Sequence, residues 1–174
     1  MEKLKNPLTN WIECCSAAGY ALTVLPMKPK PRRVILYYHS VKPYQVEGFS
    51  RQMAWLTEYC SCCRPGQMFD APTGPRIRAA VTFDDGFESL FKTAFPVLKQ
   101  YKIPATVFGP TGHTGQTPAW FLEPGCRDGD EKVMDAAGLR RAQDEGFEIG
   151  SHTVSHCRLS AMDSESIRRE LSDS

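Results

Sequence analysis

The sequence predicts an α/β domain with a parallel sheet or barrel, because short apolar runs alternate with segments of helical periodicity. The chain has 174 residues, of which 41% are hydrophobic, which suits one globular domain with a sizeable core. The apolar runs are rich in β-branched and aromatic residues and end at Gly, Pro or polar residues. Short links from each helical segment to the next run are typical of βαβ units, whose strands are parallel.

The predicted elements follow one another between residues 34 and 150. Strands are predicted at 34–38, 79–83, 105–109 and 147–150, with a further short strand near 67–69. Helices are predicted at 48–60, 87–101 and 131–145. Ser50 is the candidate N-cap of the first helix, Pro96 predicts a kink in the second, and Gly146 would end the third. The segment 109–130 is rich in Gly, Pro and Thr, which predicts a long loop over the strand ends.

Residues 1–33 differ in composition from the rest of the chain. In Trp11 to Leu25, Glu13 and other polar residues interrupt the apolar run, which is therefore too polar for a transmembrane span and lacks the core of a signal peptide. We predict that this segment forms an amphipathic helix. A Pro-rich, basic connector follows. We therefore expect a helix and connector at 1–33, a folded domain at 34–174, and a cytoplasmic location.

Charge and cysteine content narrow the function classes. The net charge is +1, with 21 basic and 20 acidic residues, so no global field favours nucleic acid or an anionic membrane as a partner. The seven cysteines cannot all pair in disulfides. Cys60, Cys62 and Cys63 lack a second cluster at zinc-ribbon spacing, which favours free thiols in a reducing compartment.

The predicted strand at 79–83 stops at two adjacent carboxylates, in Val81-Thr82-Phe83-Asp84-Asp85-Gly86. Neighbouring side chains on an extended segment point to opposite sides, and Gly86 permits a bend, so the two acids could take different roles. Two close carboxylates repel each other unless a cation or a shared proton relieves the repulsion. The alternatives are a metal site with one ligand and one free base, or a solvated Asp-Asp-Gly turn.

Two histidines, His152 and His156, follow the fourth predicted strand. In a helical turn, imidazoles at i and i+4 would lie on one face, as a metal site needs. His39 and His113 are expected instead to be a hydrogen-bonded structural histidine and a solvated loop residue. Because the carboxyl ends of parallel strands meet at one edge, the acidic and histidine clusters should converge. Two imidazoles and a carboxylate suit a three-ligand Zn²⁺ site with an open position for water.

Together the two clusters resemble the motifs of the polysaccharide deacetylases of the NodB-homology type, carbohydrate esterase family 4. Thr82-Phe83-Asp84-Asp85-Gly86 matches the first motif of that family, and His152-Thr153-Val154-Ser155-His156 matches the second, His-[Ser/Thr]-x-x-His. The resemblance covers about residues 34 to 171. It implies the N-terminal part of a distorted (β/α)₇ barrel that is incomplete at its C-terminus.

The resemblance also implies roles for individual residues. Asp85, His152 and His156 would bind a divalent metal, Zn²⁺ or alternatively Co²⁺ or Ni²⁺, and Asp84 would be the catalytic base. A metal-bound water would then attack an acetyl group of an N-acetylated, or O-acetylated, polysaccharide or glycan. The later motifs of the family, Arg-x-Pro-[Tyr/Trp], Asp-x-x-Asp-Trp and Leu-x-His, are not found after His156.

Because those motifs supply oxyanion stabilisation, orientation of the base and a general acid, two alternatives stay open. One is a truncated, catalytically impaired fragment that binds metal. The other is a related metal-dependent amidase that acts on a small substrate. A truncated parallel sheet would also expose an edge strand, which predicts self-association through that edge.

Overall fold

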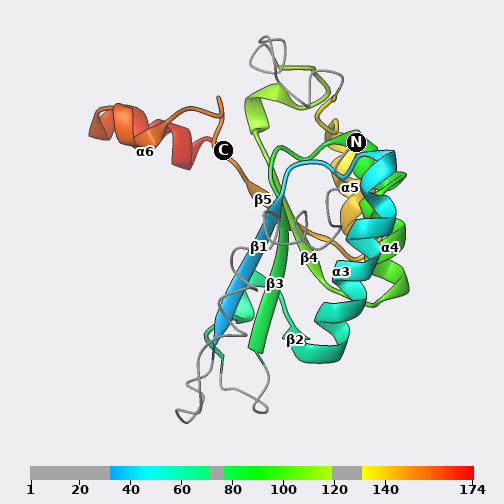
Figure 1. Ribbon diagram of the computed structural model, residues 1–174. Coiled ribbons are helices and arrows are strands. Elements are labelled where there is room, and N and C mark those ends of the chain that lie inside the picture. The colour runs from blue at the N-terminus through cyan, green and yellow to red at the C-terminus, as the bar shows by residue number, and fades with distance from the viewer. Residues whose placement is uncertain (1–31, 71–76, 119–130) are drawn as a thin grey trace, which may run out of the picture.

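The computed structural model describes residues 32–70, 77–118 and 131–174. They form a parallel sheet with helices packed on one face (Figure 1). The predicted helix of residues 11–25 and nearly all of the connector lie outside the described residues, as does most of the predicted long loop. Among the helices of the described ranges, none combines the length and the apolar character that crossing a membrane requires.

Five strands make up the sheet, and all of their pairings are parallel. They are β1 (Arg33–Tyr38), β2 (Cys60–Cys62), β3 (Ile77–Phe83), β4 (Ala105–Gly109) and β5 (Glu148–Ser151). The strand order is β1-β3-β4-β5. Strands β2 and β4 both pair with the edge of β3 that faces away from β1: β2 pairs with the first residues of β3, and β4 pairs with its last residues. The four main predicted strands are confirmed. Strand β2 was not predicted: Cys60 falls at the end of the helix predicted at 48–60, and Ser61 and Cys62 lie outside every predicted element.

In the described ranges, three helices cover one face of the sheet and a fourth lies apart from it (Figure 1). The covering helices are α3 (Val46–Tyr59), α4 (Ala94–Gln100) and α5 (Ala136–Asp144), and the separate one is α6 (Ser164–Ser172). Short 3₁₀ turns link the elements, at Pro43–Gln45 (η1), Pro65–Gln67 (η2), Glu88–Phe91 (η3), Thr111–His113 (η4) and Leu159–Ala161 (η6). The predicted strand at 67–69 was wrong, since η2 and a turn occupy this segment.

The predicted helix boundaries need correction at their N-terminal ends. Helix α3 begins before Ser50, directly after η1, so Ser50 is not its N-cap. The segment 87–101 is divided into η3 and α4, and Thr93 is the N-cap of α4. Pro96 lies in the first turn of α4, where proline is tolerated. Helix α5 begins only at Ala136, because Val133 is extended and bridges Phe87.

The core lies between the helices and the sheet. Strand residues alternate between the two faces, and Val81, Phe83 and Val107 bury their side chains against α3 and α4. On the opposite face of β1, Ile35 and Tyr37 are 53% and 67% exposed. One face of the sheet therefore builds the core, while the carboxyl ends of β3 and β5 carry the two motifs to one edge.

Candidate metal centre

Asp84 and Asp85 lie where β3 ends and the chain turns sharply. The backbone N–H of Asp84 still donates to the carbonyl of Tyr38 (2.8 Å), which extends the β1–β3 ladder by one residue. Asp85 and Gly86 then both take left-handed conformations, with φ of 65° and 62°. This turn leaves Asp84 half-buried and Asp85 only 1% exposed. The predicted bend is confirmed, and it begins at Asp85 itself.

The histidine motif lies in an irregular loop, residues 152–157, that follows β5. The helical turn considered for this loop was wrong, because Thr153 and His156 have φ of 65° and 56°. The two imidazoles nevertheless face each other, with ring centroids 5.0 Å apart. Asp85, Thr153 and His156 are three of the four described non-glycine residues with positive φ, and such residues cluster at functional sites.

The structure brings together three predicted metal ligands, Asp85, His152 and His156. Nε2 of His152 lies 3.8 Å from Oδ1 of Asp85, and Nε2 of His156 lies 3.2 Å from the same oxygen. The ligand atoms all lie within 4.8 Å of one another. The imidazole side chains are about one-third exposed (32% and 31%), so the carboxylate forms the floor of the cluster and the imidazoles form its open rim.

The electrostatics of this cluster are dominated by exclusion of solvent. Burial raises the pKa of Asp85, and the charges of His156, His39 and His152 oppose that shift. Burial also lowers the pKa of His156, against the attraction of Asp85. Although Nε2 of His156 is close, Oδ1 of Asp85 accepts no hydrogen bond from the described residues. A buried carboxylate oxygen in this state suits a bound cation.

Three other residues complete the account of the predicted site. His39 is exposed directly after β1, and its charge opposes the rise in the pKa of Asp85, so it borders the cluster; the structural role expected for it stays a prediction. The sequence signal for this location is that His39 directly follows the strand predicted at 34–38, whose carboxyl end lies at the same edge of the sheet. His113 lies in η4, is half-buried and is not one of the three clustered ligands. The thiol of Cys62, whose pKa burial raises to about 11, belongs to no ligand cluster in the part of the chain that the structure describes.

The histidine loop is held in place by η4. The N–H groups of Thr111 and Gly112 donate to the carbonyls of Thr153 (3.1 Å) and Val154 (2.9 Å). Within the loop, Oγ1 of Thr153 accepts a hydrogen bond from the N–H of His156 (3.0 Å). The position of the imidazoles therefore depends on backbone contacts with the segment after β4.

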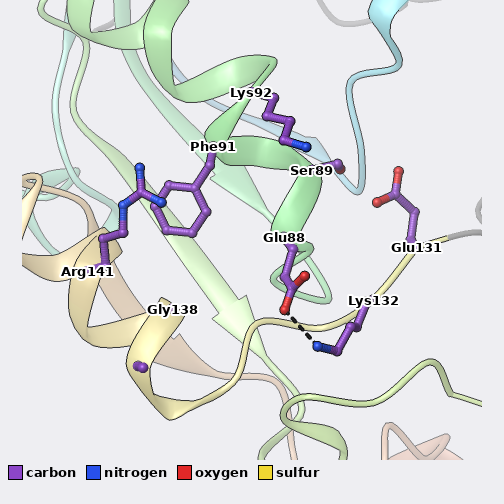
Figure 2. A pocket seen from close by; sticks show the side chains of 9 residues that line it. Glu88, Ser89, Phe91, Lys92, Glu131, Lys132, Gly138 and Arg141 are labelled. Carbon is purple, nitrogen blue, oxygen red and sulfur yellow. Dashed lines mark ion pairs between the residues drawn. The ribbon is translucent and has the colours of Figure 1, made fainter.

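A separate hollow of about 570 Å³ lies between η3 and α5 (Figure 2). Figure 2 shows Glu88 directed toward Lys132, 3.1 Å away, and the guanidinium of Arg141 over the ring of Phe91, 4.0 Å from its centroid. None of the clustered ligands lines this hollow. The three predicted ligands therefore lie at the strand ends, apart from this hollow.

Comparison with known proteins gives the family. The family model for polysaccharide deacetylase matches residues 71–174. The poly-beta-1,6-N-acetyl-D-glucosamine N-deacetylase of Staphylococcus aureus (strain N315) is 48% identical over 42 residues, 24% of this chain and 14% of that protein. YxkH of Bacillus subtilis (strain 168), whose name places it among polysaccharide deacetylases, is 28% identical over 156 residues, 83% of this chain and 51% of that protein. The chain thus spans at most about half the length of these relatives.

Solved structures share the fold. The structure of IcaB from Ammonifex degensii has a TM-score of 0.60 and 26% identity, over 79% of this chain and 58% of that one. The Streptococcus pyogenes deacetylase PplD, in complex with acetate, has a TM-score of 0.60 and 19% identity, over 85% of this chain and 67% of that one, and supports the fold alone. With the family model matching more than half of its length, this chain belongs to the polysaccharide deacetylase family.

Proposed function

We propose that this chain carries the metal site of a hydrolase that removes acetyl groups from an N-acetylated polysaccharide. In this proposal Asp85, His152 and His156 bind the metal and Asp84 is the catalytic base. The observation that supports it most is the buried carboxylate of Asp85, whose Oδ1 faces the Nε2 atoms of both histidines.

The donor set fits a catalytic zinc ion. Two imidazole nitrogens and one carboxylate oxygen are a known ligand set of catalytic zinc sites, in which a further position stays open for water or substrate. Co²⁺ and Ni²⁺ accept the same nitrogen and oxygen donors. When bound, such an ion supplies Lewis acidity that polarises an acetyl carbonyl and lowers the pKa of water.

Asp84 is suited to proton transfer in this proposal. Its backbone is fixed by the hydrogen bond from its N–H to Tyr38, and it directly precedes the ligand Asp85. Since its side chain is only half-buried, a water molecule and a substrate can reach it. The Asp84 carboxylate accepts a proton of the attacking water, whose oxygen bonds to the acetyl carbon; the C–N bond then breaks, the leaving nitrogen takes up a proton from solvent, and acetate and a free amine are released.

A polymer of N-acetylglucosamine is the proposed substrate class. The similarity to the Staphylococcus aureus enzyme, which its name assigns to poly-beta-1,6-N-acetyl-D-glucosamine, supports this choice. The partly exposed imidazoles agree with it, because an open rim lets an extended glycan approach.

The test measures acetate release and metal binding on the same preparations. Acetate release from N-acetylglucosamine oligomers is followed with Zn²⁺ or Co²⁺ for the wild type and Asp84→Asn, and calorimetric titration measures metal affinity. Release by the wild type but not by Asp84→Asn supports the proposal. Equal inactivity of both proteins, with metal binding intact, indicates a metal-binding chain without turnover. Metal binding that His152→Ala leaves unaffected would remove the proposed site.

A further inference from the structure

We infer that Glu170, on α6, is a positioning residue that holds the histidine loop in the conformation presenting both imidazoles to Asp85. Oε2 of Glu170 accepts hydrogen bonds from the N–H groups of Val154 and Ser155, each 2.9 Å long. Its Oε1 accepts one from Oγ of Ser155 (2.7 Å). Glu170 lies outside both sequence motifs. This inference rests on the proposed function, because it assumes that the loop carries metal ligands.

The histidine loop needs external support because its backbone is strained. Thr153 is β-branched, and a β-branched residue with φ of 65° is a conformational outlier. His156 has a left-handed conformation as well, with φ of 56°. Residues in such conformations persist only where the surrounding structure fixes them. A contact that fixes the backbone between the two histidines therefore bears directly on where their side chains point.

Glu170 and η4 hold this backbone from two directions. The carbonyl of Val154 accepts from Gly112, and the N–H of Val154 donates to Glu170. The next N–H, that of Ser155, donates to the same carboxylate oxygen. Two successive backbone donors on one carboxylate oxygen are charge-assisted hydrogen bonds, which are stronger than those between neutral groups. They constrain the chain at its midpoint between His152 and His156.

The place of α6 in the fold agrees with this role. None of the nine residues of α6 is buried, so apolar packing does not explain why the helix lies beside the loop. Its N-terminus is capped within the same segment, by Asp163, which accepts from the N–H groups of Glu165 and Ser166. Figure 1 shows that the C-terminal end of α6 returns toward the segment after β5. The carboxylate of Glu170 makes the hydrogen bonds that join the two.

The test compares Glu170→Ala with a matched control on the same helix, Glu165→Ala. Glu165 forms an exposed ion pair with Arg169. Calorimetric titration with Co²⁺ gives the affinity, and hydrogen exchange of the Val154 and Ser155 amides in metal-free protein reports the loop. Glu170→Ala should weaken Co²⁺ binding by about 10–100-fold, as is typical for groups that orient metal ligands, and should speed exchange. Glu165→Ala should change neither, because exposed ion pairs contribute little.

A conservative variant sharpens the test. In Glu170→Gln the amide oxygen can still accept from the two N–H groups while its NH₂ donates to Ser155, so the loss of affinity should be smaller than in Glu170→Ala. If Glu170→Ala binds Co²⁺ with the wild-type affinity and its Val154 and Ser155 amides exchange at the wild-type rate, the inference is overturned. If Glu170→Ala does not fold, Glu170→Gln and Ser155→Ala decide, and undiminished Co²⁺ binding in both overturns it.

The failure of the proposed function has a different signature. If the wild type binds no Co²⁺, the metal site fails, yet faster exchange of the two loop amides in Glu170→Ala still supports the positioning role. Unchanged exchange in that case overturns it.

Discussion

Nε2 of His156 lies 3.2 Å from Oδ1 of Asp85, yet burial raises the pKa of Asp85 and lowers the pKa of His156. Both shifts favour the uncharged form of the group. In an exposed ion pair the attraction would lower the pKa of the carboxyl group and raise that of the imidazole. Here exclusion of solvent outweighs that attraction. The lowered pKa keeps the imidazole of His156 unprotonated, as a metal ligand must be, whereas the raised pKa of Asp85 means that a bound cation has to offset the cost of its buried negative charge.

Replacement of this carboxylate should separate stability from metal binding. We expect Asp85→Asn to raise the melting temperature of the metal-free protein at neutral pH and to abolish Co²⁺ binding. Because the pKa of Asp85 is raised in the folded state, the folded wild type loses stability as the pH rises through that pKa. The neutral amide avoids this loss, and asparagine tolerates the positive φ. Thermal unfolding in the presence of a chelator, over a series of pH values, measures the difference.

The direction of the pH dependence is the control for this prediction. The advantage of Asp85→Asn should shrink as the pH falls below the pKa of an aspartate in the unfolded chain, about 3.9, because the wild-type carboxyl is then protonated in both states. Added Co²⁺ should raise the melting temperature of the wild type only. A variant that is less stable than the wild type at every pH would contradict the burial argument.

Asp84→Asn, in contrast to Asp85→Asn, should keep Co²⁺ binding and lose acetate release. Because Asp84 is not one of the three clustered ligands, we expect Co²⁺ affinity close to that of the wild type. Loss of the base should lower the rate of acetate release by about 10²–10⁴-fold. Calorimetry and the acetate assay on one preparation check both parts. Loss of Co²⁺ binding in Asp84→Asn would instead make Asp84 a ligand.

Much of the fold follows from local sequence patterns. The four main strands are runs of apolar β-formers bounded by polar residues, and short links make them parallel. The helix starts were less predictable, because they depend on contacts from elsewhere in the chain. The beginning of α5 is an example: residues before Asp135 have a helical pattern, but Val133 pairs with Phe87 and keeps them extended.

The clustering of Asp85, His152 and His156 was predictable from the sequence, whereas the backbone of the histidine loop was not. The spacing of His152 and His156 also fits a helical turn, and only the contacts of the folded chain select the left-handed conformations observed. Glu170 follows Ser155 by 15 residues and accepts hydrogen bonds from the backbone N–H groups of Val154 and Ser155 as well as from Oγ of Ser155, and hydrogen bonds to backbone donors leave no residue pattern. Side chains that act through the backbone of another segment therefore need the structure to be found.

Thr153 allows a test of the hydrogen bond inside the histidine loop. We expect Thr153→Ala to lower the free energy of unfolding by about 1 kcal/mol, because the N–H of His156 loses its acceptor and the strained φ remains. Thr153→Ser keeps the hydroxyl and removes the β-branch, so its stability should equal or exceed that of the wild type. Urea denaturation of the metal-free proteins measures both. Equal stability of the alanine variant and the wild type would show that this hydrogen bond contributes nothing.

Gly112 tests the contact between η4 and the histidine loop. A Cβ at this position would lie 2.7 Å from the carbonyl oxygen of Val154, closer than real Cβ contacts allow, and the obstructing atom belongs to the backbone. Gly112→Ala should therefore displace the loop and weaken Co²⁺ binding by roughly tenfold or more, in the range seen when groups that orient metal ligands are lost.

Gly48→Ala is the matched control, because no atom lies within 4 Å of its added Cβ. Gly48 lies inside α3, so its replacement should stabilise the protein by about 0.5–1 kcal/mol and leave Co²⁺ affinity unchanged. Wild-type Co²⁺ affinity in Gly112→Ala would mean that the loop backbone can shift without moving the imidazoles, and that η4 does not position them.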